Sequence, residues 1–126
     1  MNNVQLVKIP LFSYLLLFLL ISCKSDSDEV WVHIDPVQCL ANPWEQEWLE
    51  NNDYDYDAYY QKSDEEKQDV FVGYFLNFGL VIYDIFETHP YELVCGACPC
   101  PKGNRFHCLV DESKLAILEE FDFVFD

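Results

Sequence analysis

The sequence predicts a small single domain of the α+β class over residues 30–126, with elements in the approximate order β-α-α-β-β-α. Segments with the two-residue alternation of strands lie among segments that carry helix-start signals. The chain of 126 residues is long enough for one small core. A cysteine-rich loop at 95–104 separates the last two predicted strands, where disulfides would staple the domain.

The first strand is predicted at 30–34, where apolar residues occupy every second position. A helix start follows at Asn42 and Pro43, because Asn is a preferred N-cap and Pro suits the first helical position. Glu45 stands three residues after the cap, where its side chain can return to the backbone of the cap. This helix is expected to end near residue 51.

Residues 51–62 are acidic and rich in tyrosine without a helical period, which predicts a loop. Ser63 and Glu66 form a capping-box pattern that predicts the start of a second helix. Apolar residues recur at helical spacing as far as Phe78, and Gly79 is placed to end that helix.

The C-terminal third predicts two strands and a helix. Residues 80–88 are β-branched and aromatic, and residues 91–94 are expected to stay extended. A second strand at 105–110 is expected to pair antiparallel with the first. Asp111 then caps a last helix at 113–121, which carries apolar residues on one face.

Composition limits the class of partner. The chain has 23 acidic and 7 basic residues, a formal net charge of −16. Phosphate backbones repel such a surface, so the charge argues against nucleic acid and against docking on anionic lipids through a basic patch. Cations, basic proteins and neutral glycans are suitable partners. The aromatic residues, including Trp31, Trp44 and Trp48, are expected mainly in the core, with an aromatic surface patch as the alternative.

The N-terminal segment has the features of a signal peptide. Residues 1–22 contain Lys8 followed by an apolar run that is too short to span a membrane. The run ends in Leu20-Ile21-Ser22-Cys23, which resembles a bacterial lipobox. The resemblance implies cleavage before Cys23, acylation of that cysteine, and attachment to the membrane by lipid, with residues 23–29 as an acidic tether.

The acidic tract after Cys23 also resembles the surface-export signal of Bacteroidota lipoproteins. That resemblance implies a domain that faces outward from the bacterial outer membrane. The alternative is an ordinary solvated linker, with the domain facing the periplasm.

The remaining cysteines are odd in number, so at most two disulfides form and one thiol is left over. The sequence does not select the spare cysteine or the pairing. The candidates for disulfides or metal ligands are Cys39, Cys95, Cys98, Cys100 and Cys108.

We favour a structural staple, in which disulfides tie the loop and its strands to Cys39 near the first helix. The main alternative is a zinc or copper site at Cys95, Cys98, Cys100 and Cys108, because thiolates at close spacing are good ligands for both metals.

Two further hypotheses concern the same loop. Residues 95–98 resemble the C-x-x-C motif of thioredoxin-like proteins, which implies a thiol-disulfide oxidoreductase with Cys95 as nucleophile. Lys102 and Arg105 on a stiff loop are also compatible with a protease inhibitor.

The stretch from 80 to 121 is similar to small, mostly bacterial and archaeal proteins in which a strand, a C-x-A-C-x-C-P-x-G loop, a second strand and a short helix follow one another. The similarity rests on the three cysteines and Ala97, Pro101 and Gly103 of that loop, together with the Leu-Val-Asp run at 109–111. It implies a fold and no activity.

Catalytic patterns do not emerge from the rest of the sequence. His33, His89 and His107 lie far apart along the chain and are each expected to be structural. No nucleophile elbow, phosphate-binding glycine loop or His-Glu-x-x-His motif is present. We therefore expect a non-enzymatic binding or structural module of the cell envelope that uses no cofactor. It is expected to be attached to the membrane at Cys23 and to have an envelope or extracellular protein as its partner.

Overall fold

The structure is a computed structural model that describes residues 28–91 and 95–126. Helices and strands are mixed, which confirms the α+β class. The order differs from the predicted one by an extra short helix, an extra 3-10 turn and an extra short strand. The elements are β1 (Glu29–Ile34), α2 (Pro43–Asn51), α3 (Tyr56–Tyr60), α4 (Asp64–Asn77), β2 (Ile82–Thr88), β3 (Arg105–Asp111), the 3-10 turn η2 (Glu112–Lys114), α5 (Leu115–Glu120) and β4 (Val124–Phe125).

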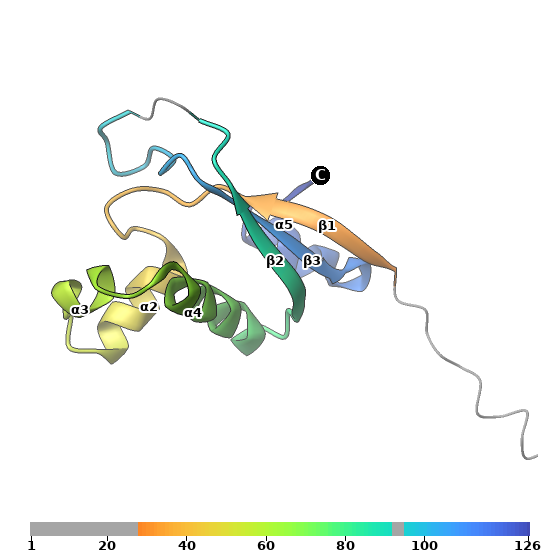
Figure 1. Ribbon diagram of the computed structural model, residues 1–126. Coiled ribbons are helices and arrows are strands. Elements are labelled where there is room, and N and C mark those ends of the chain that lie inside the picture. The colour runs from red at the N-terminus through yellow and green to blue at the C-terminus, as the bar shows by residue number, and fades with distance from the viewer. Residues whose placement is uncertain (1–27, 92–94) are drawn as a thin grey trace, which may run out of the picture.

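The strands form one antiparallel sheet in the order β2-β3-β1-β4 (Figure 1). The pairing of β2 with β3 confirms the predicted antiparallel pair. Along the sequence, α2, α3, α4 and β2 lie between β1 and β3, which are neighbours in the sheet. The register places His107 of β3 opposite both His33 of β1 and Phe86 of β2.

One face of the sheet packs against the helices and forms the core. Alternate side chains of β1 and β3 point to this face, and Val32, Cys108 and Val110 are fully buried there. The helical side is largely aromatic: Phe71 of α4 lies 4.9 Å, centroid to centroid, from both Trp44 and Phe75. Figure 1 shows α2, α3 and α4 gathered on one side of the sheet. Burial of large apolar side chains on this side is the main favourable term in folding.

The two longer helices begin where the capping signals predict. The carboxylate of Glu45 accepts a hydrogen bond from the backbone N–H of Asn42 at 3.3 Å at the start of α2. Ser63 and Glu66 form the reciprocal capping box of α4, with distances of 3.2 and 2.7 Å. Gly79 has a φ of 79° and follows α4, as its predicted role in ending the helix requires.

The prediction of a loop throughout 51–62 is wrong, because α3 forms at Tyr56–Tyr60. Asp55 caps this helix by accepting a hydrogen bond from the N–H of Ala58 at 2.9 Å. Tyr59 is only 2 % exposed and packs in a small second cluster with Leu40 and Leu49. A single buried side chain anchors the short helix, so the segment lacks the repeated apolar spacing that reveals longer helices.

The C-terminal helix is shorter than predicted. Asp111 accepts a hydrogen bond from the N–H of Ser113 at 2.8 Å, as its capping role predicts, but a 3-10 turn comes first and α5 begins at Leu115. The short strand β4 then pairs with Val32 and His33 of β1. Two paired residues are too few for an alternation pattern, so the sequence carries no strand signal there.

The second face of the sheet carries Trp31 and His33 of β1, Phe86 of β2, and His107 and Leu109 of β3, and we call it the open face. Its rings contact one another: Phe86 stacks on His107 and lies edge-on to Trp31. Trp44, by contrast, is buried among the helices, and Trp48 is half-buried beside them. The described aromatic residues are therefore divided between the core, the open face and other exposed positions such as Tyr54 and Tyr60.

Candidate functional site

Two disulfides hold the cysteine-rich loop. Cys39 pairs with Cys98 and Cys95 pairs with Cys100, at sequence separations of 59 and 5 residues. Cys39 lies between β1 and α2, so the first pair joins the loop to the segment that leads into the first helix. The prediction of disulfide bonds is thereby confirmed.

Hydrogen bonds fasten the same two segments beside the disulfide. The N–H of Gln38 donates to the carbonyl of Cys100 at 2.9 Å, and the N–H of Lys102 donates to the carbonyl of Pro36 at 2.8 Å. The side-chain amide of Gln38 also donates to the carbonyl of Pro101 at 3.2 Å. The loop is thus attached through its backbone as well as through cysteine.

Cys108 is the unpaired cysteine among the described residues. It lies on β3 with its side chain fully buried in the core. Burial, and to a smaller extent the negative charge of Asp126, raises the pKa of the Cys108 thiol to about 12. The thiol therefore stays protonated near neutral pH and is a poor nucleophile.

This pairing bears on the two hypotheses that use free thiols. A cysteine in a disulfide offers no thiolate to a metal, and Cys108 lies in the core apart from the loop. The oxidoreductase hypothesis needs a Cys95–Cys98 pair, whereas each of these residues has another partner here. Both hypotheses therefore concern a reduced form of the loop and stay predictions.

The two basic residues of the loop region are engaged in ion pairs. Lys102 contacts the carboxylate of Glu45, whose side chain is buried at the start of α2. Arg105 donates to the two oxygens of Asp35 at 2.6 and 2.9 Å. Hydrogen bonding from Arg105 holds the pKa of Asp35 below its usual value, although burial opposes this. Both cations therefore have partners within the domain, which differs from the free presentation that the inhibitor hypothesis expects.

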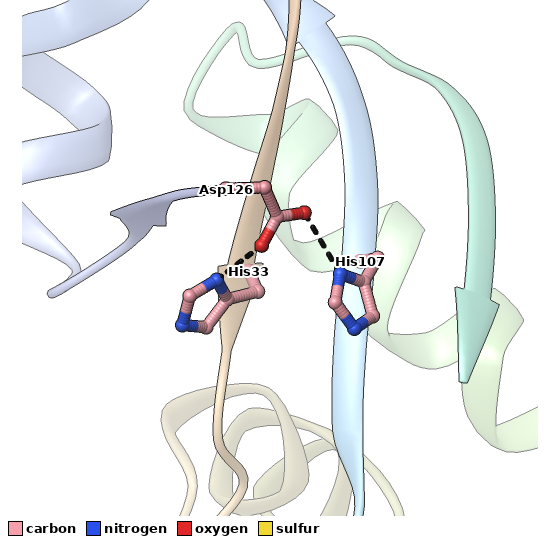
Figure 2. Close-up of side chains that lie close together, drawn as sticks. All are labelled: His33, His107 and Asp126. Carbon is pink, nitrogen blue, oxygen red and sulfur yellow. Dashed lines mark hydrogen bonds and ion pairs between the residues drawn. The ribbon is translucent and has the colours of Figure 1, made fainter. Parts of the chain in front are cut away.

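A separate polar cluster lies at the open face. His33 and His107 sit opposite each other on β1 and β3, and Asp126 directly follows β4. The carboxylate of Asp126 lies between the two rings (Figure 2): Nδ1 of His33 is 2.5 Å from one oxygen, and Nδ1 of His107 is 2.8 Å from the other. One ligand atom from each residue lies within 4.8 Å of the others.

The ring of His107 is held on three sides. Its Nε2 lies 3.0 Å from Oγ1 of Thr88, and its Nδ1 faces Asp126. Phe86 stacks on it with an interplanar angle of 4° and a centroid distance of 4.5 Å. These contacts fix both the position and the plane of the imidazole.

Two opposing effects act on the Asp126 carboxyl. Partial burial raises its pKa, but hydrogen bonds from His107 and His33, together with their charges, lower it by more. The net pKa of Asp126 is therefore below its ordinary value, and the group is an anion near neutral pH. The hydrogen bonds from the two imidazoles to the Asp126 carboxylate can hold β4 against the sheet. The same three side chains also supply the donor atoms of a metal site.

The sequence predictions missed this cluster, because they treated each histidine as isolated. In each predicted strand, His33 and His107 alternate with apolar residues and so lie on the face turned away from the core. This shared placement was the only indication in the sequence that they could meet. Only the register of β1 against β3 makes them neighbours, and only the pairing of β4 with β1 brings Asp126 to them. His89, in contrast, lies outside the cluster, where Nε2 is 3.3 Å from a carboxylate oxygen of Glu87.

The predicted signal peptide at 1–22, the lipidation site Cys23, most of the tether at 23–29 and the expected extended residues 92–94 lie outside the described residues. Within 28–91 and 95–126, no helix has the length and apolar character needed to cross a membrane. Comparisons with protein-family models, with curated proteins and with solved structures found no match for this chain.

Proposed function

We propose that the chain is a lipid-anchored, disulfide-stabilised module of the bacterial outer membrane that docks an envelope or extracellular protein and catalyses no reaction. The lipobox-like run that ends at Cys23 supports the anchor, and the acidic tract after it supports an outward-facing domain. The two disulfides add independent support, because such bonds persist in oxidising compartments and are rare in the cytosol.

The open face of the sheet is the observation that carries the docking role. Phe86 is 45 % exposed on β2, the edge strand of this face, with Trp31 edge-on to its ring and His107 stacked against it. Aromatic side chains that are held rigidly by neighbours lose little conformational freedom on binding, and aromatic residues are enriched at protein interfaces. The face therefore presents a preorganised aromatic surface to a partner.

The charge of the chain favours a partner with basic groups around this contact. The net charge of −16 attracts a cationic surface and repels nucleic acid and anionic lipid headgroups. We expect electrostatic attraction to accelerate the encounter and the aromatic contact to retain the partner.

Photocrosslinking in intact cells tests the docking role. A photoreactive phenylalanine analogue replaces Phe86 in the full-length chain, and the same analogue replaces Phe78 as the matched control. Phe78 is suitable because it is 44 % exposed, against 45 % for Phe86, but packs against Tyr74 and Phe121 beside the helices. We expect a discrete protein adduct from position 86 and none from position 78. Equal adducts at both positions, or none at 86, would contradict the proposal.

The anchor has its own test. Cys23→Ala in the full-length chain should abolish labelling by a radioactive fatty acid and either release the protein to soluble fractions or leave its precursor uncleaved. Normal lipid labelling of this variant would exclude Cys23 as the anchor. Removal of the domain by protease added to intact cells would distinguish an outward-facing domain from one that faces the periplasm.

A further inference from the structure

We infer that His33, His107 and Asp126 form a binding site for a divalent first-row transition metal ion, with zinc as the probe. Two imidazole nitrogens and one carboxylate oxygen are a common protein ligand set for such ions, with a fourth position left to water or another ligand. The inference goes beyond the proposed docking role, since it depends on three side chains of this chain and on no protein partner.

The geometry is close to what a metal requires. The three candidate ligand atoms lie within 4.8 Å of one another. In a tetrahedral zinc site the ligand atoms are roughly 3.4 Å apart, as follows from bond lengths of about 2.0–2.1 Å. Separations of up to 4.8 Å must therefore close by up to about 1.4 Å, and the contacts of 2.5 and 2.8 Å between the imidazole nitrogens and the carboxylate oxygens must open. Movements of this size are within reach of side-chain rotation. Asp126 is the natural residue to move, because it follows a strand of only two residues and its side chain is 29 % exposed.

The imidazole protons can rearrange to suit the metal. In the structure Nδ1 of each ring faces the carboxylate, so Nδ1 carries the proton in the hydrogen-bonded neutral form. A metal needs the lone pair of Nδ1 instead. A neutral His107 provides it by losing the Nδ1 proton and gaining one on Nε2, with no net change in charge.

Thr88 supports either arrangement of His107. Its Oγ1 lies 3.0 Å from Nε2, and a hydroxyl can both donate and accept a hydrogen bond. It donates to Nε2 when Nδ1 carries the proton, and it accepts from Nε2–H when Nδ1 binds the metal. This is the role of the outer partner that metal-binding histidines usually have. Thr88 is thus a positioning residue for the site.

Rigidity and charge support the same conclusion. The register of β1 and β3 fixes the two histidines opposite each other, and the stacked ring of Phe86 holds the plane of His107. The side chains of His33 and His107 are 13 % and 15 % exposed, so they are mostly shielded from water while remaining accessible from the open face. The net charge of −16 raises the local concentration of divalent cations.

Zinc titration of the full-length, disulfide-intact protein in detergent tests the inference. Binding is followed by competition with a chromogenic chelator, and perturbation of the imidazole NMR signals of His33 and His107 provides a second measurement. His89→Asn is the matched control, because His89 is an exposed histidine outside the cluster. We expect one zinc ion per chain for the wild type and for this control, with equal affinity.

The variants within the cluster should separate metal binding from folding. Asp126→Asn and His33→Asn should each weaken zinc binding by at least about tenfold, and Thr88→Val by about tenfold. Far-UV circular dichroism and an unchanged disulfide mass identify the variants that are folded, and any one folded cluster variant is sufficient. Absence of zinc binding by the wild type, wild-type affinity in a folded Asp126→Asn or His33→Asn variant, or an equal loss in His89→Asn would overturn the inference.

Discussion

Asp35 and Arg105 show how single residues connect distant parts of the chain. Asp35 directly follows β1, and Arg105 begins β3, 70 residues later. The two hydrogen bonds between them are bidentate and charge-assisted, the geometry in which Arg pairs most strongly with a carboxylate. The phenol of Tyr91 also donates to Asp35, at 2.8 Å. The pair therefore secures the end of the sheet from which the cysteine-rich loop emerges.

Asp35→Asn should lower the free energy of unfolding by about 1–2 kcal/mol near neutral pH, since a charge-assisted hydrogen bond is replaced by a weaker neutral one. Because the folded pKa of Asp35 is depressed, its contribution is present above the unfolded pKa and is lost as the pH falls through the folded value. The difference in free energy of unfolding between the wild type and Asp35→Asn should therefore become smaller below about pH 4.

Urea unfolding on both sides of about pH 4 measures this difference, with the exposed Asp69→Asn as the control variant. A difference in free energy that does not change with pH would contradict the role given to the Asp35 carboxylate.

At the scale of elements, capping determines where helices begin. The hydroxyl of Ser63 accepts the N–H of Glu66 while the carboxylate of Glu66 accepts the N–H of Ser63, so two backbone donors at the start of α4 are satisfied. Hydrogen bonding to Ser63 lowers the pKa of the Glu66 carboxyl. α4 supplies Phe71 and Phe75 to the core, so its start affects the packing of the whole domain.

Ser63→Ala should therefore lower the free energy of unfolding by about 1 kcal/mol, the usual cost of removing an N-cap side chain. Ser63→Thr retains a hydroxyl acceptor and should restore most of the loss. Chemical denaturation of the three proteins provides the comparison. A similar loss in the Thr and Ala variants would show that the hydroxyl does not stabilise the helix.

At the scale of the molecule, the Cys39–Cys98 disulfide closes most of the chain between β1 and β3. The enclosed segment includes α2, α3, α4 and β2, and the sequence separation is 59 residues. The Cys95–Cys100 disulfide closes a separation of only 5 residues. In the chain-entropy model, a disulfide that closes the longer loop removes more conformational freedom from the unfolded state.

The double variant Cys39→Ala/Cys98→Ala should lose about 4 kcal/mol of stability, whereas Cys95→Ala/Cys100→Ala should lose about 2 kcal/mol. Unfolding of both variants in denaturant, without reductant, tests this order. An equal or reversed order would mean that the longer disulfide does not act by restricting the unfolded chain.

Local signals in the sequence determined much of the fold. The alternation at 30–34, the caps at Asn42, Ser63 and Asp111, and the turn at Gly79 each operate within a few residues, so each was predictable. With Cys23 set aside for the predicted lipid, five cysteines remain, and this odd number predicted at most two disulfides and a spare thiol. Such features depend on short-range sterics and hydrogen bonding, which the tertiary structure preserved.

Tertiary structure alone decided which distant residues meet. A register shift between Ile82 and Asp84 lets Ile82 and Ile85 both face the core, although simple alternation would separate them. The pairing of β1 with β3 and with β4 brings His33, His107 and Asp126 together. Cys108 is buried on the core side of β3, away from the other cysteines, and is therefore the thiol left without a disulfide. These outcomes depend on contacts across long separations, whose register is determined by packing of the whole core rather than by any local pattern.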